Sequence, residues 1–176
     1  RLEGGRVIWV EDSSKLFFSH NTCFVEGGAF CRLFAENNII EINNCSFLAK
    51  SVPIWGTPMY RAFIGGIWME SKLIIHNTEI DSFGLAIPVR MFSNVTVTNT
   101  DIRNCGSGIS VERDASSLYV TDCNIYDNIC GIEIDNFDFT YDGLLINNCN
   151  FWGNDMDVGY EVSDSFSPDS IKMEYN

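Results

Sequence analysis

The sequence predicts an all-β fold, a parallel β-solenoid of about six to seven coils. Three observations predict it: a segment that recurs every 22–33 residues, an asparagine at one fixed position in nearly every copy, and a Gly-led apolar segment after most copies. No amphipathic helical pattern interrupts the repeat, and the Leu-x-x-Leu-x-Leu pattern of leucine-rich repeats does not recur. We therefore expect each repeat to form one coil of strands.

The recurring segment alternates between apolar and polar positions. Each copy ends at an apolar anchor residue, and the anchors are Phe24, Phe47, Ile80, Ile102, Ile125 and Phe151. The positions seven and five before the anchor are apolar in almost every copy, which is the period of a strand with one buried face. The position two before the anchor is Thr or Cys. We predict that these three columns face inward, with a bend between the last two.

An asparagine ladder marks the predicted bend. It stands three positions before each anchor and consists of Asn21, Asn44, Asn77, Asn99, Asp122 and Asn148. Asparagine tolerates the left-handed backbone of a tight bend, and stacked Asn side chains can hydrogen-bond from coil to coil. Glycine opens the next strand in copies such as Gly108-Ile109-Ser110-Val111. We expect that glycine to supply positive φ at a second corner.

The 176 residues predict a single domain over residues 1–176. The longest repeat spacing contains an insertion at about residues 51–64, which holds two prolines, and an irregular tail covers about residues 163–176. Because an open solenoid end exposes unpaired backbone, we expect the chain to be a piece of a longer solenoid. The alternative is that the polar tail caps the end.

The net charge of −13 excludes nucleic acid as a natural partner, because a polyanion is bound through Lys and Arg. No apolar run is long enough for a membrane span. Residues 111–176 hold 14 of the 24 acidic side chains and only 2 of the 11 basic ones. Such an end attracts cations or a basic partner, or else it is a solvated surface.

Seven cysteines cannot all pair within one chain. Cys45, Cys123 and Cys149 share the small inward column with threonines. Cys123 and Cys149 fall on neighbouring coils, so a disulfide between them is geometrically possible. The alternative is that they are buried thiols that act as small apolar groups.

The repeat resembles the right-handed parallel β-helix superfamily, often called pectin-lyase-like, and the asparagine ladder carries this resemblance. Gly27-Gly28-Ala29-Phe30 and Phe18-Ser19-His20-Asn21 are similar to the GGA[I] and FxxN motifs of polymorphic outer membrane protein repeats. The resemblance implies a right-handed β-helix. It also implies surface display and adhesion, with an extracellular or cell-surface location.

Asn99-Thr100-Asp101 resembles one motif of polygalacturonase-like hydrolases, although their companion motifs are absent. Asp101 is expected to stack beside Glu79, with the two carboxylates roughly 5 Å apart, a spacing suited to acid–nucleophile work or calcium. His76 is expected close to them. These three residues are the catalytic candidates of an alternative function; a solvated face is the simpler interpretation.

Glu112, Glu133 and Asp135 form a second expected acidic cluster, on the Gly-led strands. Stacked like charges repel unless a cation or a basic partner neutralises them. They are the candidate metal ligands, and calcium is the one possible cofactor; otherwise we expect none.

The candidate partner-binding face consists of large apolar side chains that we expect to point outward. They are Phe18, Phe30, Trp68, Ile74, Tyr119 and Leu145. Exposed apolar stripes mark contacts with other proteins, and aromatic ones also stack on sugar rings. Cover by the insertion is the alternative.

These observations favour a non-catalytic structural or adhesive β-helix segment of a larger surface or filament-like protein. Its partners would be other protein chains, or further coils of the same protein, at the ends and the lateral face. A glycan is a further possible partner. The alternative is a polysaccharide-active enzyme, a glycoside hydrolase or lyase.

Overall fold

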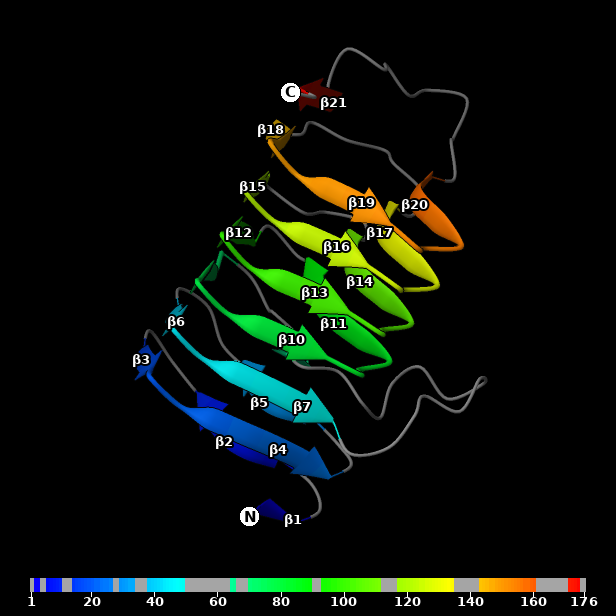
Figure 1. Cartoon of the computed structure of the whole chain (residues 1–176). Helices are drawn as coiled ribbons and strands as arrows, with labels where there is room; N and C mark the ends of the chain where they lie inside the picture. Colours follow the sequence, from blue (N-terminus) through cyan, green and yellow to red (C-terminus); the bar gives the residue numbers. More distant parts are fainter. Residues whose placement is uncertain are drawn as a thin grey trace.

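The computed structural model describes residues 2–3, 6–10, 14–26, 29–33, 38–49, 64–65, 70–89, 93–111, 117–134, 143–160 and 171–174. Side chains are described within 14–24, 38–49, 70–89, 93–111, 117–134 and 143–159. The described residues form a stack of strands without a helix, and β1 and β21 lie at its opposite ends (Figure 1). Accordingly, this part of the chain holds no helix with the length and apolar character of a membrane span.

Three walls of parallel strands enclose the core, and each coil visits them in turn. The first wall is a seven-stranded sheet in the order β21 (Ile171–Glu174), β18 (Gly143–Asn147), β15 (Ser117–Thr121), β12 (Asn94–Thr98), β9 (Lys72–His76), β6 (Ile39–Asn43) and β3 (Lys15–Ser19). The second wall is a seven-stranded sheet in the order β1 (Leu2–Glu3), β4 (Thr22–Glu26), β7 (Ser46–Ala49), β10 (Glu79–Asp81), β13 (Asp101–Arg103), β16 (Asn124–Tyr126) and β19 (Asn150–Trp152).

The third wall consists of two shorter sheets. One has the order β2 (Arg6–Val10), β5 (Ala29–Leu33) and β8 (Ile64–Gly65), and the other has the order β11 (Leu85–Val89), β14 (Ser107–Val111), β17 (Cys130–Ile134) and β20 (Met156–Tyr160). Four successive coils, β9–β11, β12–β14, β15–β17 and β18–β20, each contribute one strand to each wall, and their third-wall strands form the four-stranded sheet. The all-β parallel solenoid predicted from the sequence is therefore confirmed.

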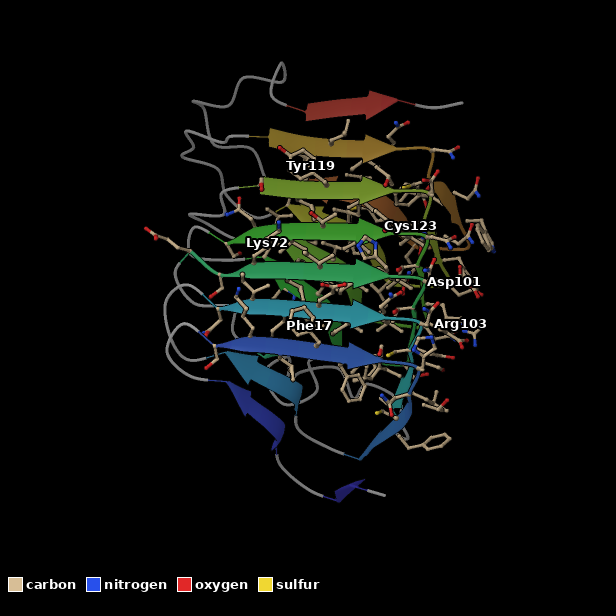
Figure 2. All side chains as sticks on the ribbon, turned by 90° about the vertical axis from the view of Figure 1, so that its left-hand side faces the viewer. Phe17, Lys72, Asp101, Arg103, Tyr119 and Cys123 are labelled. Carbon is tan, nitrogen blue, oxygen red and sulfur yellow. The ribbon has the colours of Figure 1, made fainter. Side chains whose placement is uncertain are left out.

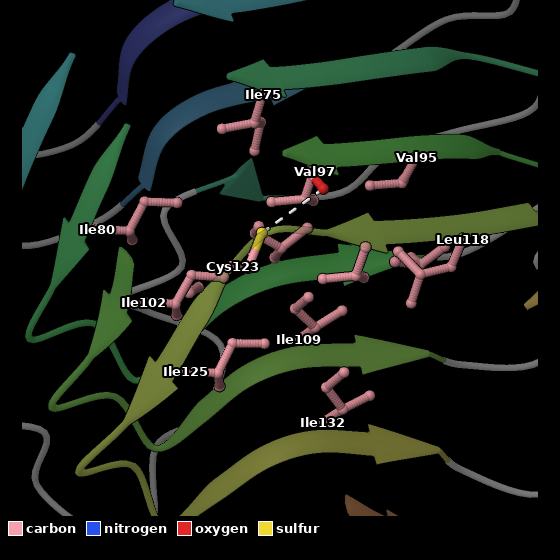
Figure 3. Close-up of a cluster of buried hydrophobic side chains, with 14 of the residues drawn as sticks. Ile75, Ile80, Val95, Val97, Ile102, Ile109, Leu118, Cys123, Ile125 and Ile132 are labelled. Carbon is pink, nitrogen blue, oxygen red and sulfur yellow. Dashed lines mark hydrogen bonds between the residues drawn. The ribbon is translucent and has the colours of Figure 1, made fainter. Parts of the chain in front are cut away.

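The register keeps equivalent residues of successive coils directly above one another. Ile80 pairs with Ile102 and Ile102 pairs with Ile125, so side chains of one column stack along the rod. The inward side chains of the middle coils are buried. Figure 3 shows part of this cluster, with Ile80, Val97 and Ile109 among its members. Each fully buried aliphatic side chain contributes about 1.5–3 kcal/mol relative to an exposed one. From the second coil onward, the predicted inward columns are therefore the core of the described part of the protein.

The asparagine ladder lies at the corner between the first and second walls, as predicted. All its members from the second coil onward have left-handed backbone, with φ of 46–56° at Asn44, Asn77, Asn99, Asp122 and Asn148. The Asn99 amide donates to Asn77 Oδ1, and the Asn148 amide donates to Asp122 Oδ1. The Asn77 amide instead donates to Asn43 Oδ1, at 3.3 Å. Side-chain hydrogen bonds thus join two pairs of successive ladder members, and a third bond is diverted to Asn43 beside the ladder.

The prediction for the first coil is wrong by one residue. His20, and not Asn21, has the left-handed backbone there, with φ of 57°, and its ring lies against the Asn44 amide. Asn21 is exposed, and its amide donates to the Ser19 carbonyl at 2.6 Å. Histidine belongs with Asn and Asp to the residues that adopt this conformation more readily than others. It can therefore close the corner in place of an amide.

The same shift moves the aromatic residues of the first coil. Phe18 pairs with Ile42 and packs on Phe47 with ring centroids 5.8 Å apart, so it faces inward and is not part of an outward face. Phe17 and Phe24 point outward instead, with 66% and 46% of their surface exposed. The anchor position of this coil belongs to Cys23, which pairs with Phe47.

Within the described part of the third wall, Gly108 and Gly131 act through their size and not through positive φ, contrary to our expectation. Positive φ at the corner before them occurs at Ser82, Asn104 and Asp127. A Cβ placed on Gly108 would lie 2.6 Å from the carbonyl oxygen of Gly131 on the next coil. Glycine therefore permits close approach of backbone between coils.

Candidate functional site

Glu79 and Asp101, the predicted carboxylate pair, occupy directly paired positions on β10 and β13. Their side chains point out of the second wall, and Figure 2 places Asp101 beside Arg103 on that side of the molecule. The structure therefore brings the pair together as the repeat predicts. The chemistry of the pair depends on what surrounds it.

Arg103 occupies the centre of this outer surface. Its Nη2 forms an ion pair with Glu79, its Nε lies 2.9 Å from Asp81 Oδ2, and its Nη1 donates to the Tyr126 hydroxyl at 2.9 Å. Arginine suits this position because its planar guanidinium presents several donors in fixed directions. One side chain thus connects three successive coils through β10, β13 and β16.

The carboxylates also have neutral hydrogen-bond donors. Ser46 Oγ donates to Glu79 Oε2 at 3.1 Å, and Asn124 Nδ2 donates to Asp101 Oδ1 at 2.8 Å. Asn150 Nδ2 in turn donates to Asn124 Oδ1 at 2.9 Å. Both carboxylates are therefore held by side chains of neighbouring coils.

These contacts favour the charged forms of Arg103 and Asp81. Partial burial alone would raise the pKa of Asp81, but hydrogen bonds from Asn104, Ser82 and Arg103 outweigh burial and hold that pKa below its ordinary value. The pKa of Arg103 is raised by its hydrogen bonds to Tyr126 and Asp81 and by the charge of Glu79. Both shifts strengthen the ion pair between Arg103 and Asp81.

His76, the third catalytic candidate, is bound elsewhere. Its Nδ1 contacts the Thr98 hydroxyl on β12, within the first wall. No hydrogen bond between His76 and Glu79 or Asp101 is found within the described side chains. The two carboxylates are thus adjacent on the second wall, whereas His76 ends a strand of the first wall.

Sequence analysis missed the aromatic part of this surface. Tyr126 and Trp152 stack with ring centroids 4.3 Å apart and an interplanar angle of 8°, and the guanidinium of Arg103 lies 5.9 Å from the Tyr126 ring. All three belong to the column one position after the anchor, together with Asp81. Aligning that column would have found the cluster.

Of the predicted metal ligands, only Glu133 lies within the described residues; Glu112 and Asp135 lie outside them. Glu133 is exposed on β17 and accepts a hydrogen bond from Ser107 Oγ at 2.5 Å. Across the described ranges, no group of three or more His, Cys, Asp or Glu side chains is arranged to hold a metal ion. A calcium site at the acidic end therefore stays a prediction.

The outward column of the first wall carries the predicted partner face, with one replacement. The strand register stacks its members, which we call the apolar column: Phe17, Glu41, Ile74, Thr96, Tyr119 and Leu145. Phe17 and Tyr119 lie on this face in Figure 2, and Tyr119 is 40% exposed. Phe18 is not part of the face. The Phe30 side chain and the whole of Trp68 lie outside the described residues.

Fold and register define the molecule as a parallel β-solenoid of three-walled coils. A family model described as right handed beta helix region matches residues 61–176, which is more than half of the chain. The chain belongs to this right-handed β-helix family. No curated protein and no solved structure matches the chain in the same comparisons.

Proposed function

We propose that the chain is a non-catalytic structural and adhesive segment of a larger surface or filament-like protein. In this proposal the β-helix is a rigid scaffold, and the apolar column of the first wall is a lateral binding face for another protein chain or a glycan. The location we propose is extracellular or at the cell surface.

The observation that carries the proposal is the use of outward polar side chains to connect coils. Arg103 holds Glu79 and Asp81 from one coil and Tyr126 from another. Asp101 is held by Asn124 from the following coil. Charged pairs that bridge several elements restrain movement between them, because any displacement of one coil breaks several charge-assisted bonds. A structural role makes use of this stiffness.

The lateral face is supported by exposure. Phe17 leaves 66% of its surface in solvent and Tyr119 leaves 40%, on the same flat sheet face. Aromatic groups of this size contribute strongly to interfaces, because they bury a large area with few rotatable bonds. Glu41 and Thr96, between them in the column, offer polar contacts beside the rings.

Adhesion is tested by immobilising the chain and measuring its binding to panels of defined glycans and purified extracellular-matrix proteins. Tyr119→Ser is expected to weaken a specific interaction at least about tenfold. Lys72→Ser, at an exposed position of the same wall, is the matched control and is expected to leave binding unchanged. Equal binding by both variants would show that the apolar column is not the binding face.

A polysaccharide-active enzyme is the second candidate, and the pairing of Glu79 with Asp101 is the observation that favours it. The test is turnover of neutral and acidic polysaccharides by the chain and by Glu79→Ala/Asp101→Ala. Ser107→Ala, on the third wall, controls for loss of an outward hydrogen bond. Turnover that is reproducible and disappears in the double variant alone would replace the structural proposal with the enzymatic one.

A further inference from the structure

Cys123 and Cys149 occupy equivalent places on adjacent coils, immediately before β16 and β19. The strands that follow them pair Asn124 with Asn150, and the Asn150 N–H donates to the Cys123 carbonyl at 2.9 Å. Neighbouring strands lie about 4.8 Å apart, and disulfides join residues whose Cα atoms are about 4.4–6.8 Å apart. The backbone thus holds the two cysteines at a separation that a disulfide can span.

The two thiols also point the same way. Cys123 Sγ lies 3.1 Å from the Thr121 carbonyl oxygen and 3.6 Å from that of Val97, a contact drawn in Figure 3. Cys149 Sγ repeats this arrangement one coil later, 3.2 Å from the Asn147 carbonyl oxygen and 3.6 Å from that of Val120. Both thiols are free in the structure. The two thiols lie close enough for each to shift the pKa of the other.

Their interaction shifts the two pKa values in opposite directions. The Cys123 side chain and two backbone groups outweigh the effect of burial and lower the pKa of Cys149 to about 7. The interaction with Cys149, together with burial, raises the pKa of Cys123. By contrast, burial raises the pKa of Cys105 to about 12. The direction of these shifts makes Cys149 the first of the two thiols to lose its proton, and the thiolate is the form that attacks disulfides.

Cys149 is also the more solvent-accessible of the two cysteines. Cys123 is 1% exposed, whereas Cys149 is half-buried. The difference follows from the sheet order, because β19 is the edge strand of the second wall among the described strands. A small reagent can therefore reach Cys149 first, with Cys123 placed behind it.

We propose that Cys123 and Cys149 form a modification site, at which a low-molecular-weight disulfide of the glutathione type joins the two coils by a disulfide bond. The inference does not depend on the proposed function.

The reaction proceeds in two exchange steps. The Cys149 thiolate attacks one sulfur of oxidised glutathione, which forms a mixed disulfide and releases one glutathione thiolate. Cys123 then loses its proton to solvent and attacks the Cys149 sulfur, which forms the protein disulfide and releases the second glutathione. The protein loses two electrons and two protons, and one glutathione disulfide becomes two thiols.

The bond would connect β19 covalently to β16 and close the intervening coil as a loop. Closing a loop of about 26 residues restricts the unfolded chain, and for a protein of this size the expected rise in Tm is roughly 5–10 °C. Adding a reductant should reverse the rise.

The test equilibrates the full chain in buffers of reduced and oxidised glutathione, blocks remaining thiols and maps the fragments by mass spectrometry. Cleavage before aspartate separates Cys123 in residues 122–126, Cys149 in residues 142–154 and Cys130 in residues 127–134. The expected result is a mass loss of about 2 Da, with fragments 122–126 and 142–154 joined. A lasting glutathione adduct on Cys149, a link to fragment 127–134, or unmodified thiols in excess oxidised glutathione would each overturn the proposal.

Matched variants use the residue that the repeat itself places in this column. Cys123→Thr follows Thr78 and Thr100, which are buried at the same position of earlier coils. It should abolish the linked fragments and the rise in Tm, whereas Cys45→Thr should keep both. If Cys123→Thr does not fold, Cys149→Thr at the half-buried position serves in its place, and the fragment map of the unaltered chain still decides the outcome.

Discussion

Replacing Asn128 should cost far more stability than replacing any outward asparagine of the same coil. Asn128 is 3% exposed and lies three residues after its anchor, on the core side of the corner between the second and third walls. Its Oδ1 accepts the Cys105 N–H at 2.8 Å, and its Nδ2 donates to the Ile102 carbonyl at 3.2 Å and to Asn154 Oδ1 at 3.0 Å. One amide therefore satisfies backbone groups of the preceding coil.

The magnitude follows from what Asn128→Ala leaves behind. The variant leaves two buried backbone groups, the Cys105 N–H and the Ile102 carbonyl, without the side-chain partner that they have in the unaltered protein. Each buried group that loses its hydrogen-bond partner costs about 1–3 kcal/mol. We expect a total loss of about 2–4 kcal/mol, since some relaxation accompanies the change. Asn124→Ala is the matched control, because it removes the same amide with two hydrogen bonds from a partly exposed outward position. Its expected cost is below about 1 kcal/mol.

The assay is equilibrium unfolding in urea, followed by circular dichroism and tryptophan fluorescence. Asn128→Asp adds a second arm, because it keeps the acceptor for Cys105 but loses the amide donors and buries a carboxylate. Burial raises the pKa of such a group, so this variant should recover stability relative to the unaltered protein as the pH falls and the carboxyl is protonated. The reasoning is refuted if Asn128→Ala is no less stable than Asn124→Ala.

Three further predictions concern the outer network, the first coil and the thiol pair. Asp81→Asn should cost about 1 kcal/mol at pH 7 in urea unfolding; the lowered pKa of Asp81 means that this difference persists above about pH 4 and closes as the pH falls through the folded-state value. A difference that grows on acidification would contradict the ion pair. Phe18→Ser should lower stability by about 2–4 kcal/mol and Phe17→Ser by less than about 0.5 kcal/mol, and the reverse order in thermal melts would restore the register predicted from the sequence. Alkylation of Cys149 by iodoacetamide should reach half its maximal rate near pH 7, and a midpoint near the ordinary value of about 8.5 would contradict an interaction between the two thiols.

The solenoid could be predicted because each structural position is sampled once per coil. Ile80, Ile102 and Ile125 stand at one position of the repeat and prove to stack directly. Asn99 and Asn148 likewise share both their place in the repeat and their left-handed backbone. A pattern repeated in this way separates the requirements of the fold from the variation of single coils.

The first coil shows where the pattern loses its power. Leu16, Phe17 and Phe18 are consecutive apolar residues, so alternation cannot say which of them face inward. The repeat predicts the aromatic Phe24 as the anchor, although the smaller Cys23 fills the core position. Only pairing with the next strand fixes the parity of such a run.

The candidate site was predicted in part for a related reason. Stacking within one column predicted that Glu79 and Asp101 meet, and they do. Arg103 belongs to a different outward column and reaches across to Glu79 with a long, flexible side chain. Repeat spacing constrains backbone positions, but it does not constrain how far an outward side chain extends or which neighbour it selects.

The in-register pairing of coils makes the length of the rod adjustable in whole units. Asp101 pairs with Asn124, so residues 101–123 correspond to one complete circuit of the three walls. Removing that circuit would join Thr100 to Asn124, two residues that already follow one another in the repeat, and would shorten the rod by about 4.8 Å. Tandem duplication of the same segment would lengthen it by the same step. Duplication or deletion of one repeat in the gene can thus change the length of the β-helix, while the inward columns of the remaining coils stay in register.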